Sequence, residues 1–466
     1  MKKYSFIIIS IYFTLLLHSC GGNKSSNDSK GNNLTSSTYD TTNLNFKRDS
    51  IYVSVPVSTN TNETFALYIP RVLKTNRVPV IIFFDPHGGG HFVLQKYKRL
   101  ADKFHCILIG SNSSKNGMDF QSTVAIANNL INEALLKLPI DSSLIYLAGF
   151  SGGGKVAIDA AKQNSLVSAV VYAGAATPLD NANHSFPLLG FAGIDDMNYT
   201  FLLDYDKNIS AEFPHYLIEW SGKHEWPNES AFIDAFYFIA FDEMKKKKIP
   251  TDENLIGAIG YRNEGDHADL GGPVGIYNHF RKEIFLLNGL VPLEEEKNNA
   301  AAFEKSNDSV KKYLIDKNNL VALETAQQKM FDDAFTQKDL NWWKAETNRL
   351  RINNTGVDGA MNQRLLGYLS LRSYGLLTKL FMTGRDALPF APKLLEIYLD
   401  ADPKNADQRY FHALYYALHN NFEGAISQLK EAVALGFNDK QKMATEKAFL
   451  GMATDLRFQQ IVNSLK

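Results

Sequence analysis

The hydrophobic pattern of the chain changes at about residue 250. Between residues 50 and 220 the apolar residues form short runs rich in β-branched and aromatic side chains, and beyond residue 250 they recur at helical spacing. Two runs separated by Ser-Thr-Asn-Thr-Asn predict an antiparallel hairpin, at 51–57 and 65–69. Continuous apolar runs predict buried strands at 78–84, 106–110, 144–149, 169–173, 188–192 and 216–220. Helical patterns lie between them at 93–103, 120–138, 155–162 and 233–246. This alternation predicts an α/β fold in which helices cover both faces of a mostly parallel sheet.

The second half of the chain reads as helices only. They are expected at 280–287, 323–335, 342–350, 360–381, 391–399, 406–418, 422–435, 439–450 and 456–465. Residues 409–436 are the most regular part, with small residues Ala413, Ala425 and Ala432 where paired helices would approach closely, and this spacing resembles a tetratricopeptide repeat. The alternative is an irregular helical domain.

The first residues have the order of a secretory signal. Met1-Lys2-Lys3 precedes an apolar stretch of about 14 residues, which is shorter than the roughly 20 residues that span a bilayer. Leu17-His18-Ser19-Cys20 then resembles the lipobox of bacterial lipoproteins, although His18 departs from its usual small or apolar residue. The resemblance implies lipidation of Cys20 and a location in the bacterial cell envelope, on a membrane face that the sequence does not reveal. The alternative is an ordinary signal peptide cut near Ser19.

Composition narrows the function classes. The chain has 49 Lys and Arg against 50 Asp and Glu among 466 residues, so it lacks the basic balance typical of nucleic-acid binding. It has only two cysteines, and Cys106 lies in an apolar run, so we expect a buried core thiol and no disulfide framework. The sequence has no H-E-x-x-H, paired-cysteine or calcium-loop motif, and we expect neither a metal nor another cofactor.

The strongest chemical motif is Gly149-Phe150-Ser151-Gly152-Gly153, between a predicted strand and a predicted helix. A G-x-S-x-G at such a turn is typical of a nucleophile elbow, in which the serine oxygen is exposed and the next N–H, of Gly152, faces the developing oxyanion. The competing interpretation is a phosphate-binding loop, since Gly149, Gly154 and Lys155 fit part of that motif. Val156, however, stands where it needs a Ser or Thr to bind magnesium.

Three further segments extend the hypothesis of a serine nucleophile. His87-Gly88-Gly89-Gly90 follows a strand and resembles the H-G-G-G loop of esterases, which implies an oxyanion donor at Gly88 or Gly89. The strand at 188–192 leads into Gly193-Ile194-Asp195-Asp196, where the resemblance selects Asp196 as the triad acid and leaves Asp195 as the alternative. The last segment is Gly222-Lys223-His224-Glu225-Trp226-Pro227, which makes His224 the general base; His267 is the other contender.

These four motifs resemble the α/β-hydrolase superfamily, and the G-x-H-x-W-P segment is similar to polyhydroxybutyrate-depolymerase-like and feruloyl esterases. Together with the leader and the helical pattern, this resemblance predicts five segments: a signal peptide at 1–20, a flexible linker at 21–44, an α/β-hydrolase domain at 45–249, a connecting helical segment at 250–300 and a repeat-like helical domain at 301–466.

The resemblance implies a membrane-anchored serine esterase that works through an acyl-enzyme with Ser151, Asp196 and His224 as its triad. We expect a medium-sized ester substrate, such as an aryl or carbohydrate ester. The alternatives are a serine peptidase of the same fold and a catalytically silent binding protein. The C-terminal helices could bind a protein partner or roof the active site.

Overall fold

The computed structural model describes residues 46–179, 186–250, 252, 256–261, 272–352, 356–383 and 389–465. Its contacts group residues 40–466 into one unit. The predicted signal peptide, the linker and the anchor residue Cys20 therefore lie outside the described residues, as does His267. Within the described part of the chain, none of the helices combines the length and apolar character needed to cross a bilayer.

An eight-stranded sheet forms the first part of the unit, in the order β1-β2-β4-β3-β5-β6-β7-β8. β1 and β2 form an antiparallel hairpin, β2 also pairs antiparallel with β4, and all other neighbours are parallel. The strands are β1 (Ile51–Val57), β2 (Asn60–Tyr68), β3 (Val78–Phe84), β4 (Ile107–Ser111), β5 (Ile140–Phe150), β6 (Val167–Ala173), β7 (Leu188–Gly193) and β8 (His215–Trp220).

Helices cover both faces of this sheet because its central strands are apolar on both sides. Every residue of β3 and β4 is buried. One face packs on α1 (Gly90–Phe104) and α5 (Glu229–Lys247), and the other packs on α2 (Phe120–Lys137), α3 (Gly152–Gln163) and α4 (Tyr199–Asn208). The strand order and the helices on both faces confirm the predicted α/β-hydrolase fold.

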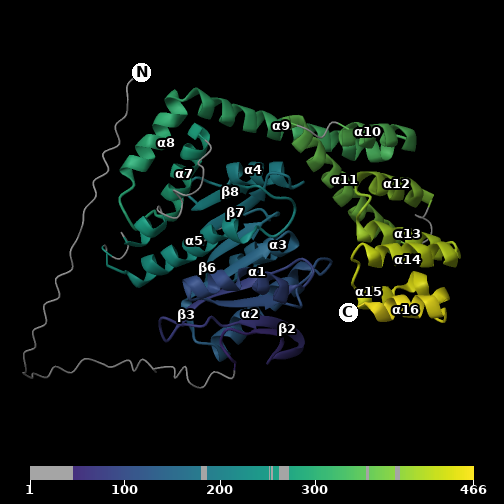
Figure 1. The fold of residues 1–466 in the computed structure, drawn as a ribbon, viewed down its shortest axis with the longest axis horizontal. Helices are drawn as coiled ribbons and strands as arrows, with labels where there is room; N and C mark the ends of the chain where they lie inside the picture. The colour runs from purple at the N-terminus through teal and green to yellow at the C-terminus, as the bar shows by residue number, and fades with distance from the viewer. Residues whose placement is uncertain are drawn as a thin grey trace, which may run out of the picture. The chain divides into compact units, whose positions relative to one another are not determined.

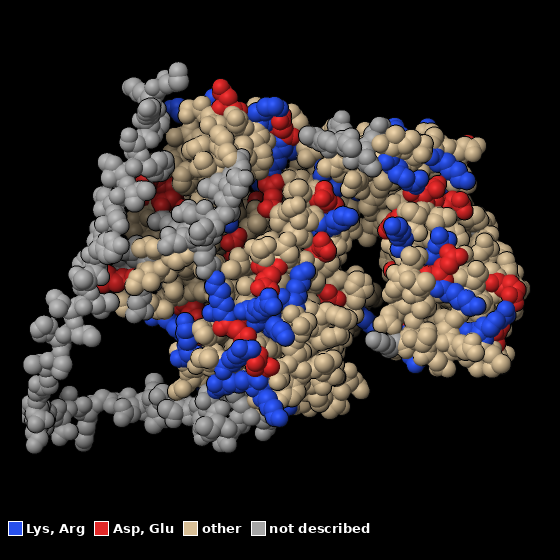
Figure 2. All heavy atoms as spheres, in the orientation of Figure 1, with Lys and Arg blue, Asp and Glu red and all other residues tan. Residues whose placement is uncertain are grey.

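The second part of the unit is all-helical; its α7 packs on β8 and α5, and α9 leads from α8 to the later helices (Figure 1). Its elements are α7 (Gly272–Leu286), α8 (Glu294–Ser306), α9 (Asp308–Gln337), α10 (Leu340–Ile352), α11 (Gly356–Thr383), α12 (Ala391–Ala401), α13 (Ala406–Leu418), α14 (Phe422–Ala434), α15 (Lys440–Thr445), a 3₁₀ turn at Lys447–Met452 and α16 (Leu456–Ser464). In the view of Figure 2, acidic and basic side chains are interspersed over these later helices, as on an ordinary solvated surface.

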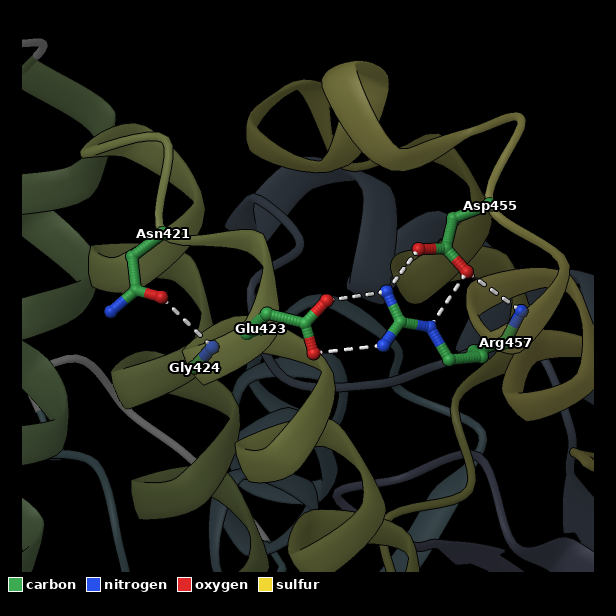
Figure 3. Close-up of polar contacts among 5 residues, drawn as sticks. All are labelled: Asn421, Glu423, Gly424, Asp455 and Arg457. Atoms are coloured by element: carbon green, nitrogen blue, oxygen red, sulfur yellow. Dashed lines mark hydrogen bonds and ion pairs between the residues drawn. The ribbon is translucent and has the colours of Figure 1, made fainter.

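The helices α13 and α14 form the most regular hairpin. Asn405 and Asn421 cap them by accepting hydrogen bonds from backbone N–H groups of the first turn, at Asp407 and Gly424. Figure 3 shows Arg457, at the start of α16, between the carboxylates of Glu423 and Asp455, which ties the start of α14 to the start of α16. The likeness of this hairpin to a tetratricopeptide repeat stays a prediction.

Candidate active site

Ser151 lies in a strained turn between β5 and α3. Its φ of 53° and ψ of −124° fall where a residue with a Cβ is rarely found. Glycines permit the turn because the backbone passes very close by. A Cβ on Gly149 would lie 2.0 Å from the carbonyl oxygen of Gly153, and one on Gly153 would lie 1.9 Å from that of Phe84. The strand, sharp turn and helix are the context that the sequence motif predicts for a nucleophile elbow.

The structure brings Ser151, His224 and Asp196 into one hydrogen-bonded chain. His224 Nε2 lies 2.9 Å from Ser151 Oγ, and His224 Nδ1 lies 2.9 Å from each carboxylate oxygen of Asp196. Asp196 is only 1% exposed, whereas the His224 side chain remains 22% exposed. A carboxylate at Nδ1 requires the proton to be on that nitrogen, which leaves Nε2 free to accept the proton of the serine hydroxyl.

The turn after β7 positions the carboxylate. The Asp196 N–H donates to the carbonyl of Gly193, and Asp196 Oδ1 accepts a hydrogen bond of 2.8 Å from the N–H of Asn198. The neighbouring Asp195 donates its own N–H to the carbonyl of Gly222, in the loop that carries His224. Of the two aspartates that the sequence leaves open, the geometry therefore places Asp196 against the histidine.

The loop after β8 holds His224 by aromatic packing. The rings of His224 and Phe150 have their centroids 4.7 Å apart, and Trp226 packs 5.8 Å from the same phenylalanine. Trp226 Nε1 donates to Asp85 Oδ2 at 2.8 Å. Asp85 follows β3, so this bond links the histidine loop to the predicted oxyanion loop.

The Gly-rich loop after β3 is organised around Asp85. The N–H groups of His87 and Gly89 donate to Asp85 Oδ1 at 2.9 and 3.2 Å, and the Gly88 N–H donates to the Asp85 carbonyl at 3.1 Å. The predicted oxyanion donors Gly88 and Gly89 thus have their N–H groups directed at Asp85 in this structure, and their donor role stays a prediction. His87 points its side chain into solvent, 84% exposed.

Gly152 is the first residue of α3, so its N–H belongs to the positive end of the helix. Among the described residues, that N–H donates no hydrogen bond. Asn116, which was not predicted from the sequence, lies beside Gly152 in space. The three atoms nearest to a Cβ built on Gly152 all belong to the carboxamide of Asn116, with Oδ1 at 1.9 Å.

Asn116 reaches this position because its backbone N–H donates to the carbonyl of Pro86 at 2.8 Å. It lies in the polar loop Asn112-Ser113-Ser114-Lys115-Asn116 after β4. The carboxyl ends of neighbouring parallel strands meet at one edge of the sheet, and polar residues after β4 are therefore a signal that could have indicated Asn116.

The acid-bearing turn is also held from the C-terminal helices, which the sequence did not indicate. Arg364, on α11, donates from Nη1 to the carbonyl of Ile194 at 2.8 Å.

No three His, Cys, Asp or Glu side chains in the described ranges gather as a metal site would require.

No protein-family model matches the chain, and no curated protein matches it. Solved structures do resemble 41–42% of it. An esterase from the archaeon Pyrobaculum calidifontis is 16% identical over 42% of this chain and 83% of its own, with a TM-score of 0.34. An S-formylglutathione hydrolase from Agrobacterium tumefaciens is 16% identical over 41% and 93%, with a TM-score of 0.33. The fluorophosphonate-binding serine hydrolase F of Staphylococcus aureus is 14% identical over 41% and 96%, with a TM-score of 0.32.

Proposed function

We propose that the protein is a serine hydrolase of carboxylic esters, with Ser151 as nucleophile, His224 as general base and Asp196 as the acid that orients the base. The hydrogen-bonded chain from Ser151 Oγ through His224 to Asp196 carries this proposal. A buried carboxylate, a half-buried histidine and a strained serine at a helix N-terminus together suit nucleophilic acyl transfer.

In the proposed reaction, Ser151 Oγ attacks the ester carbonyl while His224 Nε2 takes the hydroxyl proton. The oxyanion that forms is stabilised by the N–H of Gly152 and the positive end of α3. When the tetrahedral intermediate collapses, the bond to the alcohol oxygen breaks and His224 returns the proton to that oxygen. A water molecule then attacks the acyl-enzyme by the same steps, which releases the carboxylic acid and restores Ser151.

The proposed substrate is a medium-sized ester, such as an aryl ester or an acetyl ester on carbohydrate, following the resemblance to feruloyl and related esterases. We further propose that lipidation of Cys20 anchors the enzyme to a membrane of the bacterial cell envelope. The Ser-, Asn- and Gly-rich sequence 21–44 would act as its tether.

The test is turnover of p-nitrophenyl acetate and butyrate by the chain from residue 21 and by its Ser151→Ala variant. We expect the variant to lose about three orders of magnitude or more in kcat, because removal of the nucleophile leaves only binding and oxyanion stabilisation. The exposed Ser54 on β1 offers a matched Ser54→Ala control, which should keep full activity. Equal rates in wild type and the Ser151→Ala variant would exclude Ser151 as the nucleophile.

A further inference from the structure

A buried ion pair of the C-terminal helices lies against the turn that carries Asp196. Arg364, on α11, donates to the carboxylate of Glu324, on α9, from Nε at 3.0 Å and from Nη2 at 2.7 Å. The arginine and glutamate side chains are 3% and 0% exposed. A two-bond pair of this kind fixes the plane of the guanidinium as well as its position.

Both members of the pair also contact the segment around the acid. Arg364 uses its remaining nitrogen, Nη1, to donate to the Ile194 carbonyl at 2.8 Å, and its guanidinium lies 5.1 Å above the ring of Tyr199. Glu324 Oε1 accepts a hydrogen bond of 3.3 Å from Thr200 Oγ1. The pair therefore holds the chain two residues before Asp196 and again at the start of α4.

A third contact lies between these two points. Gly367 is one turn beyond Arg364 on α11, and a Cβ at that position would lie 3.1 Å from Cβ of Met197. The helix thus packs directly on the residue after Asp196. The contacts of α9 and α11 extend over residues 194–200, and Asp196 stands inside that stretch.

We propose that Arg364 is a positioning residue for the triad acid, so that the C-terminal helices complete the catalytic site of the hydrolase domain. This inference rests on the proposed function. The triad acid is useful only while its carboxylate faces His224 Nδ1, and a displacement of about 1 Å in a catalytic group can lower a rate by about a hundredfold. Within the hydrolase domain the turn at 194–198 is bonded through the Ile194 and Asp195 N–H groups, to the carbonyls of Trp220 and Gly222, and through Asn198 Nδ2 to the Gly174 carbonyl. The Arg364 fork adds the bond to the Ile194 carbonyl and connects the turn to two long helices.

The decisive variant replaces both partners, Arg364→Met with Glu324→Met. A single Arg364 substitution would leave a carboxylate in a buried site, where burial already raises the pKa of Glu324 despite the arginine. Replacing a buried pair by apolar residues of similar size is often neutral for stability, so the double variant should remain folded. It nevertheless removes the hydrogen bonds to Ile194 and Thr200.

We expect the double variant to lose at least about tenfold in kcat on p-nitrophenyl acetate, with KM within about twofold of wild type, since the acid assists chemistry rather than binding. Arg364→Lys should retain part of the activity, because a lysine can still reach Glu324 or the carbonyl but lacks the fork.

The same two helices supply a matched control. Arg372 on α11 pairs with Asp332 on α9 at 2.8 Å, and both side chains are about 40% exposed and away from the acid turn. The variant Arg372→Met with Asp332→Asn should leave kcat unchanged.

A second variant, Gly367→Val, tests the same inference if the double variant does not fold. Gly367→Val leaves the ion pair in place and forces Met197 to move, so it should lower kcat while circular dichroism remains that of the wild type. Wild-type kcat in a folded Arg364→Met, Glu324→Met variant, or in a folded Gly367→Val variant, would overturn the inference. The absence of ester turnover in the wild type would instead reject the proposed function itself.

Discussion

At the scale of single residues, the site depends on a few polar side chains that point at backbone groups. Asp85 is the clearest case, because its two carboxylate oxygens accept hydrogen bonds from two N–H groups of the Gly-rich loop and from the Trp226 indole. It therefore connects the oxyanion side of the site to the histidine side.

Asp85→Asn should weaken this connection without changing the size of the side chain. The asparagine can present only one acceptor oxygen, so one of its donors loses its partner, and the free energy of unfolding should fall by roughly 1–3 kcal/mol. Urea unfolding measures the change. In a Trp226→Phe background, which already lacks the indole donor, the same substitution should cost less; an equal cost in both backgrounds would show that the indole bond contributes nothing.

Asn116 offers a second prediction at this scale. Its carboxamide borders Gly152, where the developing oxyanion would lie, and the N–H groups of Gly88 and Gly89 are directed at Asp85. Asn116 Oδ1 is the atom nearest to Gly152, and a half-turn of the carboxamide about its Cβ–Cγ bond places the Nδ2 donor there. With Nδ2 as that donor, we expect Asn116→Ala to lower kcat by about tenfold or more, as loss of an oxyanion donor does. Asn116→Asp should lower it further, because a carboxylate would repel the oxyanion. Steady-state rates with an ester substrate measure these changes. An unchanged kcat in both variants would show that Asn116 takes no part in the reaction.

At the scale of elements, a cluster of polar groups holds the end of β8 against α9. Glu219 accepts hydrogen bonds from Lys317 at 2.5 Å, from Tyr313 at 2.8 Å and from Tyr199. Burial alone would raise the pKa of Glu219, but the Lys317 ammonium and these hydrogen bonds hold it below its ordinary value of 4.5. Burial would likewise lower the pKa of Lys317, and Glu219 raises it above 10.5.

The signs of these shifts predict how stability depends on pH. A carboxylate with a lowered pKa stabilises the fold above its ordinary value of 4.5, and this contribution is lost as the pH falls through the folded-state pKa. Lys317→Met should therefore cost roughly 1.5–3 kcal/mol at pH 7, as expected for hydrogen bonds to a charged group. The difference in unfolding free energy from wild type should shrink below about pH 4. A difference that stays constant from pH 7 to pH 3 would contradict this account.

Most elements of the sheet-bearing part were predictable, because buried parallel strands are continuous apolar runs. The helix α4 was missed, since its ten residues carry two aspartates and a lysine and bury only Tyr199, Thr200, Leu202 and Leu203. Helix α8 was missed for a similar reason: most of its side chains are polar, and Ala300 alone is buried. For α9 only 323–335 was predicted, whereas the helix runs over Asp308–Gln337, because its first half has no continuous apolar stripe.

At the candidate site, too, only residues in local sequence motifs were predictable. Ser151, Asp196 and His224 follow strand ends in motifs that can be read locally, and the structure brings these three together. Arg364 could not be found in this way, because it lies 170 residues from Ile194 along the chain and sits inside a helix without a motif. Long-range contacts of this type depend on how α11 packs on the acid turn, which no local pattern encodes.

At the scale of the whole molecule, the proposed catalytic site and the proposed anchor are in separate parts of one chain. If Cys20 is the lipidated residue, full-length wild type expressed in bacteria should incorporate an alkyne-tagged palmitate and partition into the detergent phase of Triton X-114. Cys20→Ala should do neither. The chain's other cysteine, Cys106, is buried, so Cys106→Ala is the matched control and should still incorporate the label. Labelling that persists in Cys20→Ala would contradict lipidation at this residue.

The central claim is that Ser151 is an activated nucleophile, and the most direct measurement is where a fluorophosphonate attaches. The reagent transfers its phosphonyl group to an activated serine oxygen and releases fluoride, so intact mass reports the number of adducts and peptide mass spectrometry reports their position. We predict one adduct, on Ser151, which forms much more slowly in His224→Ala because the base is missing. No adduct on folded protein, or an adduct on another residue with Ser151 unmodified, would contradict the account.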